Sequence, residues 1–218
     1  MTEFLRAENI SLAEISGGIS FCISEGGLVL LLTPKYEVNT LLTRLLIGLE
    51  IPRSGKVTLF STDTAALSAR ELLETRRRIG VAYGSGGLVS NLKVWENLTL
   101  PLYFHQPLSH AEINERGVAV LTRLGYSGNL MALPGHLTFS QSKMIGIARA
   151  MLIEPDVMMY ESPDSGFNHE EKNNFFTVAS EFHREKTGRA SIFITSNREV
   201  VRYLPEYVVF DLTKGSLP

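Results

Sequence analysis

A short apolar segment followed by a polar loop and a leucine-rich helix constrains this fold most. Residues 28–32 are all apolar and follow two glycines, which is typical of a buried strand. From Thr40 onward, apolar residues recur at the spacing of one helix face. They are Leu41, Leu42, Leu45, Leu46 and Leu49. Pro52, Ser54 and Gly55 then end the helix, and residues 56–60 predict the next strand. The order predicts an α/β protein.

The same alternation continues along the chain. Apolar periodicity predicts helices over 67–78, 109–124, 140–152 and 169–186, and strands over 79–83, 157–160, 191–195 and 207–212. Alternating strands and helices favour a mostly parallel sheet that helices cover on both faces. We expect one domain over 1–218, with a helical subdomain at about 85–155 inserted within the α/β core.

Composition limits the functional classes. A formal net charge of -2 gives no signature of nucleic-acid binding. Cys22 is the single cysteine, which argues against a disulfide framework and a cysteine-rich metal site. The longest apolar run is too short to span a bilayer, and charged residues within the first nine do not suit a signal peptide. We expect a cytoplasmic protein whose membrane role is peripheral, at the inner face of the cell membrane.

Three stretches resemble the ATP-binding subunits of ABC transporters. They are TLLTRLLIGLEIPRSG at 40–55, QSKMIGIARAMLIEP at 141–155 and VMMYESPDSGFN at 157–168. They occur in the family's order, and the resemblance extends from about residue 8 to 215. It implies a P-loop NTPase (RecA-like) fold: a mostly parallel sheet core, an ABC-type helical lobe and an antiparallel β edge.

The phosphate loop of such proteins has the pattern G-x-x-x-x-G-K-[ST], in which backbone amides and the lysine hold phosphates. At the equivalent positions Thr33 and Val38 replace the glycines and Asn39 replaces the lysine. Only Thr40 keeps its type, a hydroxyl for the magnesium side. Lys35 offers a substitute cation, but we favour a solvated loop lysine. The phosphate loop is therefore degenerate.

The positions that the resemblance assigns to catalysis have changed in the same direction. Glu161 stands at the Walker B aspartate, and Ser162 stands where a glutamate activates water. The alternative alignment makes Glu161 the catalytic base, and Pro163 argues against it. Gly84 replaces the Q-loop glutamine, and Ser196 replaces the switch histidine. No catalytic residue is intact.

The signature loop, LSGGQ in the family, caps the nucleotide held by the partner subunit. Here it reads Leu137, Thr138, Phe139, Ser140 and Gln141. Thr138 keeps a hydroxyl, whereas Phe139 stands where backbone would approach phosphate. Both halves of a composite nucleotide site are thus altered in one chain.

The segment GGLVSNLKVWENLTLPL at 86–102 resembles the stretch that receives the coupling helices of transmembrane subunits. Its wording is most similar to lipid-transport subunits of the MCE/Mla type. We therefore expect transmembrane permease partners through the 84–105 region. Leu92, Val94, Trp95 and Leu98 form either an exposed partner surface or part of the core.

Three functions follow. The first is a non-hydrolysing ABC-type subunit that binds a membrane transporter and forms a homodimer or a heterodimer with another ABC subunit. The second is a working ATPase with atypical residues, in which Thr40 and Glu161 hold magnesium and Lys35 assists. The third is a soluble pseudoenzyme scaffold for another ligand. We expect no bound cofactor beyond weak Mg-ATP, because helix N-termini bind anions without a lysine.

Overall fold

Two β-sheets organise the chain, which the computed structural model describes over residues 2–12, 15–105, 108–204 and 206–214. The antiparallel sheet has the strand order β2-β1-β4-β5. Its strands are β1 (Glu3–Leu12), β2 (Ile15–Ser24), β4 (Lys56–Leu59) and β5 (Thr62–Asp63). The second sheet is parallel, in the order β6-β7-β8-β3-β9. Its strands are β3 (Leu28–Leu32), β6 (Ile79–Ala82), β7 (Val157–Glu161), β8 (Ala190–Thr195) and β9 (Val208–Asp211).

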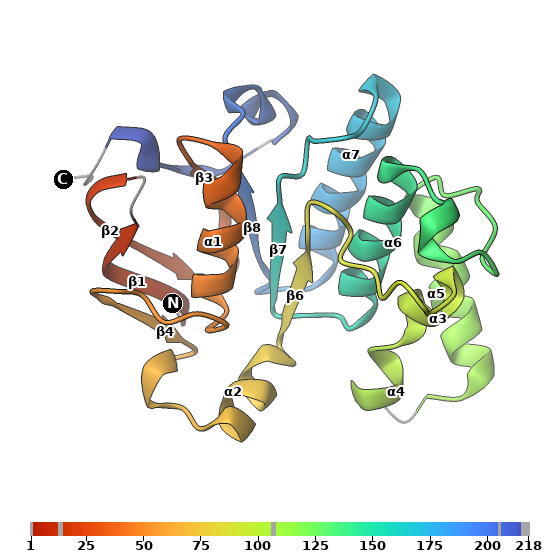
Figure 1. Cartoon of the computed structure of the whole chain (residues 1–218), viewed down its shortest axis with the longest axis horizontal. Helices are drawn as coiled ribbons and strands as arrows, with labels where there is room; N and C mark the ends of the chain where they lie inside the picture. The colour runs from red at the N-terminus through yellow and green to blue at the C-terminus, as the bar shows by residue number, and fades with distance from the viewer. Residues whose placement is uncertain (1, 13–14, 106–107, 205, 215–218) are drawn as a thin grey trace.

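Successive side chains of the parallel strands enter two different cores, because side chains alternate across a strand. Leu31, Met159 and Ile192 pack toward helix α1 (Tyr36–Leu46) and the antiparallel sheet. Leu30 and Tyr160 face the opposite side, toward helices α6 (Phe139–Leu152) and α7 (His169–Glu185). Figure 1 shows α1 between the two sheets and the other long helices beyond the parallel sheet. This layering confirms the predicted fold class, including its antiparallel β edge.

The stretch between β6 and β7 is helical, as expected. Its helices are α3 (Val94–Thr99), α4 (Leu102–His105), α5 (His110–Arg123), η2 (Pro134–His136) and α6. They share one hydrophobic core with β7 and β8, so a separate helical subdomain stays a prediction. The remaining helices are η1 (Thr64–Ala66), α2 (Ala69–Arg76), η3 (Arg198–Tyr203) and η4 (Leu212–Lys214). Among the described residues we find no helix with the length and apolar content needed to cross a bilayer.

The leucine-rich helix differs from the prediction at both ends. It begins at Tyr36, four residues before Thr40, and ends at Leu46. Gly48 has a φ of 67°, in the left-handed region that a helix does not continue through. Leu49, which was assigned to the apolar stripe, consequently lies beyond the helix and is exposed. That assignment was wrong.

Candidate functional site

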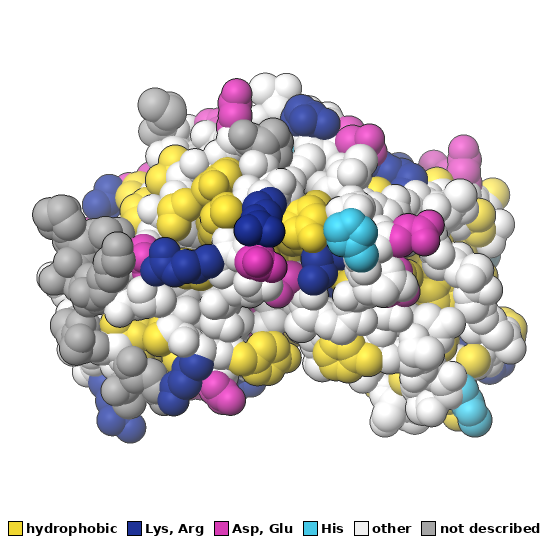
Figure 2. Space-filling view, turned by 90° about the horizontal axis from the view of Figure 1, so that it is seen from above, with side chains coloured by type: hydrophobic (Ala, Val, Ile, Leu, Met, Phe, Trp, Pro, Cys, Tyr) yellow, Lys and Arg dark blue, Asp and Glu magenta, His cyan; other side chains and the backbone are white. Residues whose placement is uncertain are grey.

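The positions compared with the nucleotide-binding motifs meet at one edge of the parallel sheet. Thr33 follows β3, Gly84 lies shortly after β6, Ser162 follows β7 and Ser196 follows β8. The carboxyl ends of parallel strands share an edge, and ligands of open α/β sheets bind there. Figure 2 views the molecule from this side and shows basic, acidic and hydrophobic side chains interspersed. The face is not a single positively charged surface for polyphosphate.

The segment at the phosphate-loop position is a helical turn. Lys35 is extended at the N-cap of α1, and Val38 N donates to Lys35 O at 3.1 Å. Val38 is buried against the core, which holds this turn in place. Lys35 itself is exposed, in agreement with a solvated lysine. Residues 33–35 form a short loop, and the first turn of α1 begins at Tyr36.

Asn39, at the lysine position, is committed to hydrogen bonds inside the protein. Thr33 Oγ1 donates to Asn39 Oδ1 at 2.5 Å, and Asn39 Nδ2 donates to Ser162 Oγ at 2.8 Å. Asn39 is only 1% exposed, and Thr33 and Ser162 are buried as well. Buried polar groups are costly unless paired, so this chain of bonds stabilises the site without a ligand.

Thr40 and Glu161 lie together, as a magnesium site requires. Thr40 Oγ1 donates to Glu161 Oε1 at 2.8 Å. Glu161 Oε2 is buried without a hydrogen-bond partner among the described residues. Burial raises the pKa of Glu161, while the bond from Thr40, the Gly84 backbone and Lys143 oppose that rise. Thr40 and Glu161 supply only two oxygen ligands for a metal ion. The described residues contain no group of three or more His, Cys, Asp or Glu that could hold a metal.

Gly84, at the Q-loop position, is enclosed. A Cβ added there would lie 3.1 Å from Tyr36 Oη and 3.3 Å from Glu161 Oε1. A glutamine would therefore have to displace the tyrosine that α1 places over this corner. The sequence comparison did not single out Tyr36, whose hydroxyl lies against Gly84.

The signature positions form a helix cap. Thr138 Oγ1 accepts from Gln141 N at 3.2 Å, and Gln141 Oε1 accepts from Thr138 N at 2.9 Å. Ser140 Oγ lies 3.2 Å from Thr138 Oγ1. Phe139 is 48% exposed, and its ring lies so close to Gly166 that a Cβ there would be 2.1 Å from it. An aromatic ring thus covers the part of this loop where backbone would meet phosphate.

Ser196 is exposed at the switch position, and its neighbours make the contacts. Thr195 Oγ1 donates to Asp164 Oδ1 at 2.9 Å, and Asn197 Nδ2 donates to Asp164 Oδ2 at 2.7 Å. Asn168, at the D-loop aspartate position, caps α7 by accepting from Glu171 N at 2.9 Å. Sequence reasoning missed Asp164, because its partners lie about thirty residues away along the chain.

Sequence reasoning also missed Lys143, which is 1% exposed in α6. Its Nζ donates to Ser162 O at 2.5 Å, to Ser165 O at 2.7 Å and to Ser165 Oγ at 3.1 Å. Burial lowers the pKa of Lys143 to about 7, against the opposing charges of Asp164 and Glu161. The available signal was a lysine at the start of the apolar part of this helix, directly before Met144 and Ile145.

The 84–105 region is partly core and partly surface. Val94 and Leu98 are buried, so these two residues belong to the core and not to an exposed partner surface. Tyr103 and Phe104 are exposed. A cavity of about 240 Å³ lies between α2 and α6, lined by residues that include Leu73, Arg76, Tyr83, Pro101, Arg149 and Ile153. Exposed aromatic side chains suit a protein partner.

The loop after β6 packs directly on α6 through two glycines. A Cβ at Gly146 would lie 2.4 Å from Gly86 O and 2.7 Å from Gly86 Cα. We expect Gly146→Ala to lower the free energy of unfolding by about 1–3 kcal/mol, because the backbones must separate. Chemical denaturation measures this change. Gly135→Ala is the control, since a Cβ there meets nothing within 4 Å; an equal effect of both changes would contradict the close packing.

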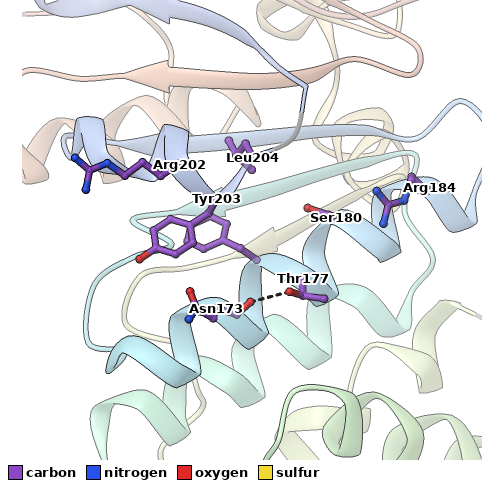
Figure 3. A pocket seen from close by; sticks show the side chains of 8 residues that line it. Asn173, Thr177, Ser180, Arg184, Arg202, Tyr203 and Leu204 are labelled. Atoms are coloured by element: carbon purple, nitrogen blue, oxygen red, sulfur yellow. Dashed lines mark hydrogen bonds between the residues drawn. The ribbon is translucent and has the colours of Figure 1, made fainter.

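A further cavity, of about 500 Å³, lies on the outer side of α7 and is shown in Figure 3. Tyr203 lies over the helix between Asn173 and Arg184, and Arg202 points away at the opposite end from Arg184. Thr177 donates to the Asn173 backbone oxygen at 2.9 Å. None of the residues lining this cavity belongs to the motif positions, so it is separate from the site at the carboxyl edge of the parallel sheet.

A parallel sheet with a strand–turn–helix unit and a Thr–Glu pair at its carboxyl edge defines the class of P-loop nucleotide-binding cassettes. The chain belongs to the ABC transporter family: the model of the family described as "ABC transporter" matches residues 17–165. The structural likeness agrees: the chain superimposes on the bacterial ABC transporter cassette MJ0796, solved as a dimer, with a TM-score of 0.83. The two are 20% identical, over 96% of this chain and 95% of that chain. The cbiO1 structure from Clostridium perfringens gives a TM-score of 0.75 at 21% identity, covering 98% of this chain and 86% of that one.

Curated relatives are named as transport ATP-binding proteins. The probable ribonucleotide transport ATP-binding protein mkl of Mycobacterium tuberculosis is 29% identical over 150 residues, 69% of this chain and 42% of that protein. The methionine import ATP-binding protein MetN 1 of Rhodococcus jostii is 28% identical over 195 residues, 89% of this chain and 57% of that protein. The chain thus spans about half the length of the curated relatives it matches.

Proposed function

We propose that this chain is a degenerate nucleotide-binding subunit of an ABC transporter that does not hydrolyse ATP and acts as a peripheral partner of the membrane-embedded permease. The observation that carries the proposal is the buried position of the Asn39 side chain. This residue stands at the phosphate-lysine position, and Thr33 and Ser162 hold its side chain in a buried hydrogen-bonded chain. The site is stabilised by its own residues, and Asn39 offers no cation to a phosphate.

Phosphate groups do not fit the residues present. A hydrogen bond to a charged group contributes about 1.5–3 kcal/mol, and Asn39 supplies no charge. Val38 adds a buried side chain at a glycine position. Without a general base at Ser162, the rate falls by about 10²–10⁴-fold. The Thr40–Glu161 pair still provides two magnesium ligands, which supports at most weak binding of Mg-ATP.

The partner surface supports a role in transport. The groove beside α2 is lined by apolar residues, Tyr83 and three arginines, and Tyr103 and Phe104 of α4 are exposed; aromatic residues and arginine are enriched at protein interfaces. We propose that a cytoplasmic segment of a permease binds here, and that the chain pairs with a second ABC subunit, identical or different. The amino-acid sequence of residues 86–102 favours a lipid-transport system. Neighbouring genes for a permease or a lipid-binding MCE protein would support that assignment.

Purified protein tests the proposal directly. We expect no saturable turnover when Mg-ATP is titrated through the millimolar range and phosphate release is followed, because the lysine and the general base are both replaced. Weak binding, followed by calorimetry, is compatible with the proposal. Saturable turnover that Glu161→Gln abolishes would show a working ATPase instead, since that change removes the carboxylate that Thr40 binds.

A further inference from the structure

The turn that joins β7 to α7, residues 162–165, receives buried hydrogen bonds from three directions. Ser162 has a φ of 47°, in the left-handed region that non-glycine residues rarely adopt, and it is buried. Such a conformation costs about 1–3 kcal/mol and persists only where surrounding contacts hold it. The contacts of this turn therefore identify what fixes the structure around it.

The strongest contacts come from α6. The Lys143 ammonium reaches the backbone oxygens of Ser162 and Ser165 and the hydroxyl of Ser165. It also lies 4.9 Å from the centroid of the Phe167 ring. All three hydrogen atoms of a lysine ammonium find acceptors on one turn. Losing these bonds would leave Ser165 O without the ammonium, whereas Ser162 O keeps bonds from Ser165 N and Ser165 Oγ.

Two further elements bind the same turn. From α1, Asn39 Nδ2 donates to Ser162 Oγ at 2.8 Å. From β8 and the residues after it, Thr195 and Asn197 donate to both carboxylate oxygens of Asp164. The family resemblance assigns these segments to contact with a nucleotide. In this chain, hydrogen bonds join the segments directly to one another.

The same helix, α6, also holds the loop that follows β6, from the turn of Lys143 onward. Arg149 Nη2 donates to Gly86 O at 2.9 Å and to Gly87 O at 2.8 Å. Gly146 packs against the Gly86 backbone on the same helix. One helix therefore contacts both the turn at 162–165 and the start of the 84–105 region.

We propose that Lys143 and the turn at 162–165 form a clamp, independent of any ligand, that fixes α6 on the parallel sheet and thereby keeps the loop at 84–87 in one position. The inference goes beyond absent hydrolysis, because it explains how the start of the 84–105 region keeps its shape with no nucleotide bound. Lys143 acts as a positioning residue for Gly86 and Gly87, through α6 and Arg149.

Native-state amide hydrogen exchange tests the clamp in the full chain without nucleotide. We expect Lys143→Met to speed exchange of the amides in residues 84–99 and at the α6 N-terminus by about tenfold or more, since several buried hydrogen bonds are lost. Amides of β1 and β2 are the internal reference and should change little. Lys172→Met, which removes a nearby lysine of the same size without any of these bonds, should leave the 84–99 amides at wild-type rates.

Two results would overturn the clamp. One is equal exchange at 84–99 in Lys143→Met and Lys172→Met. The other is a uniform rise that includes β1 and β2, which reports global destabilisation. If Lys143→Met fails to fold, Ser165→Ala removes one acceptor of the ammonium and should speed exchange of the same amides to a smaller extent. An unchanged exchange rate in Ser165→Ala would also contradict the clamp. Turnover of ATP is a separate measurement, so the clamp and the proposed function fail independently.

Discussion

Raising the pH from 7 to about 10 should stabilise this protein through Lys143. The pKa of Lys143 is lowered by burial from 10.5 to about 7 in the folded chain. Between these values the unfolded chain holds a proton that the folded chain has released, so the free energy of unfolding rises with pH. Its slope approaches about 1.4 kcal/mol per pH unit. Below about pH 7 both states are protonated, and the full cost of burying the charge is present.

Urea denaturation of wild type and Lys143→Met across this range isolates the effect. The charges around Lys143 are Asp164 and Glu161, which favour its protonated form, and Lys172, which opposes it. We expect the difference in free energy of unfolding between the two proteins to change with pH by the stated slope. Lys172→Met should follow the wild-type profile in shape. A difference that stays constant from pH 7 to 10 would mean that Lys143 is charged in the folded state throughout.

The strands were predictable because they are short and apolar on both faces. The run at 28–32 and the strand at 157–160 lie in the interior of a covered parallel sheet, where every position except the half-buried Leu28 is buried. The start of α1 was missed because the apolar face of the helix was traced only from Leu41 onward. Val38, Leu42 and Leu45 are also spaced as one helix face and are all buried, so the helical signal did extend into the phosphate-loop position.

At the site, the sequence identified which residues had changed but not what each one binds. Asn39 was recognised as a missing lysine, whereas its bond to Ser162 spans 123 residues and depends on the strand order. Lys143 and Asp164 were overlooked because neither stands at a position that the family's motifs name. Hydrogen bonds between loops at a sheet edge follow from topology, and local periodicity carries no information on them.

The buried arginine that follows α7 should have the largest effect on stability. The Arg189 side chain is fully buried, with its guanidinium 3.5 Å from the centroid of the Phe182 ring. It donates to Phe182 O, to Pro155 O at 3.2 Å and to Glu154 Oε2 at 2.5 Å. We expect Arg189→Ala to lower the free energy of unfolding by about 3–5 kcal/mol, because it creates a cavity and leaves two buried carbonyls unpaired. Thermal and urea denaturation measure the loss.

Most of that loss should come from the carbonyls and the cavity, and little from the ion pair. Glu154 is about half exposed, and exposed carboxylates gain little from a cation partner. Glu154→Gln should therefore cost under about 1 kcal/mol. Arg184→Ala, which removes an exposed arginine from the last turn of α7, should change stability by less than about 0.5 kcal/mol. If Glu154→Gln destabilises as much as Arg189→Ala, the ion pair dominates and this assignment is wrong. The expected order places Arg189 as the link that ties the end of α7 and the start of β8 to the chain before β7, at the edge of the parallel sheet opposite the site.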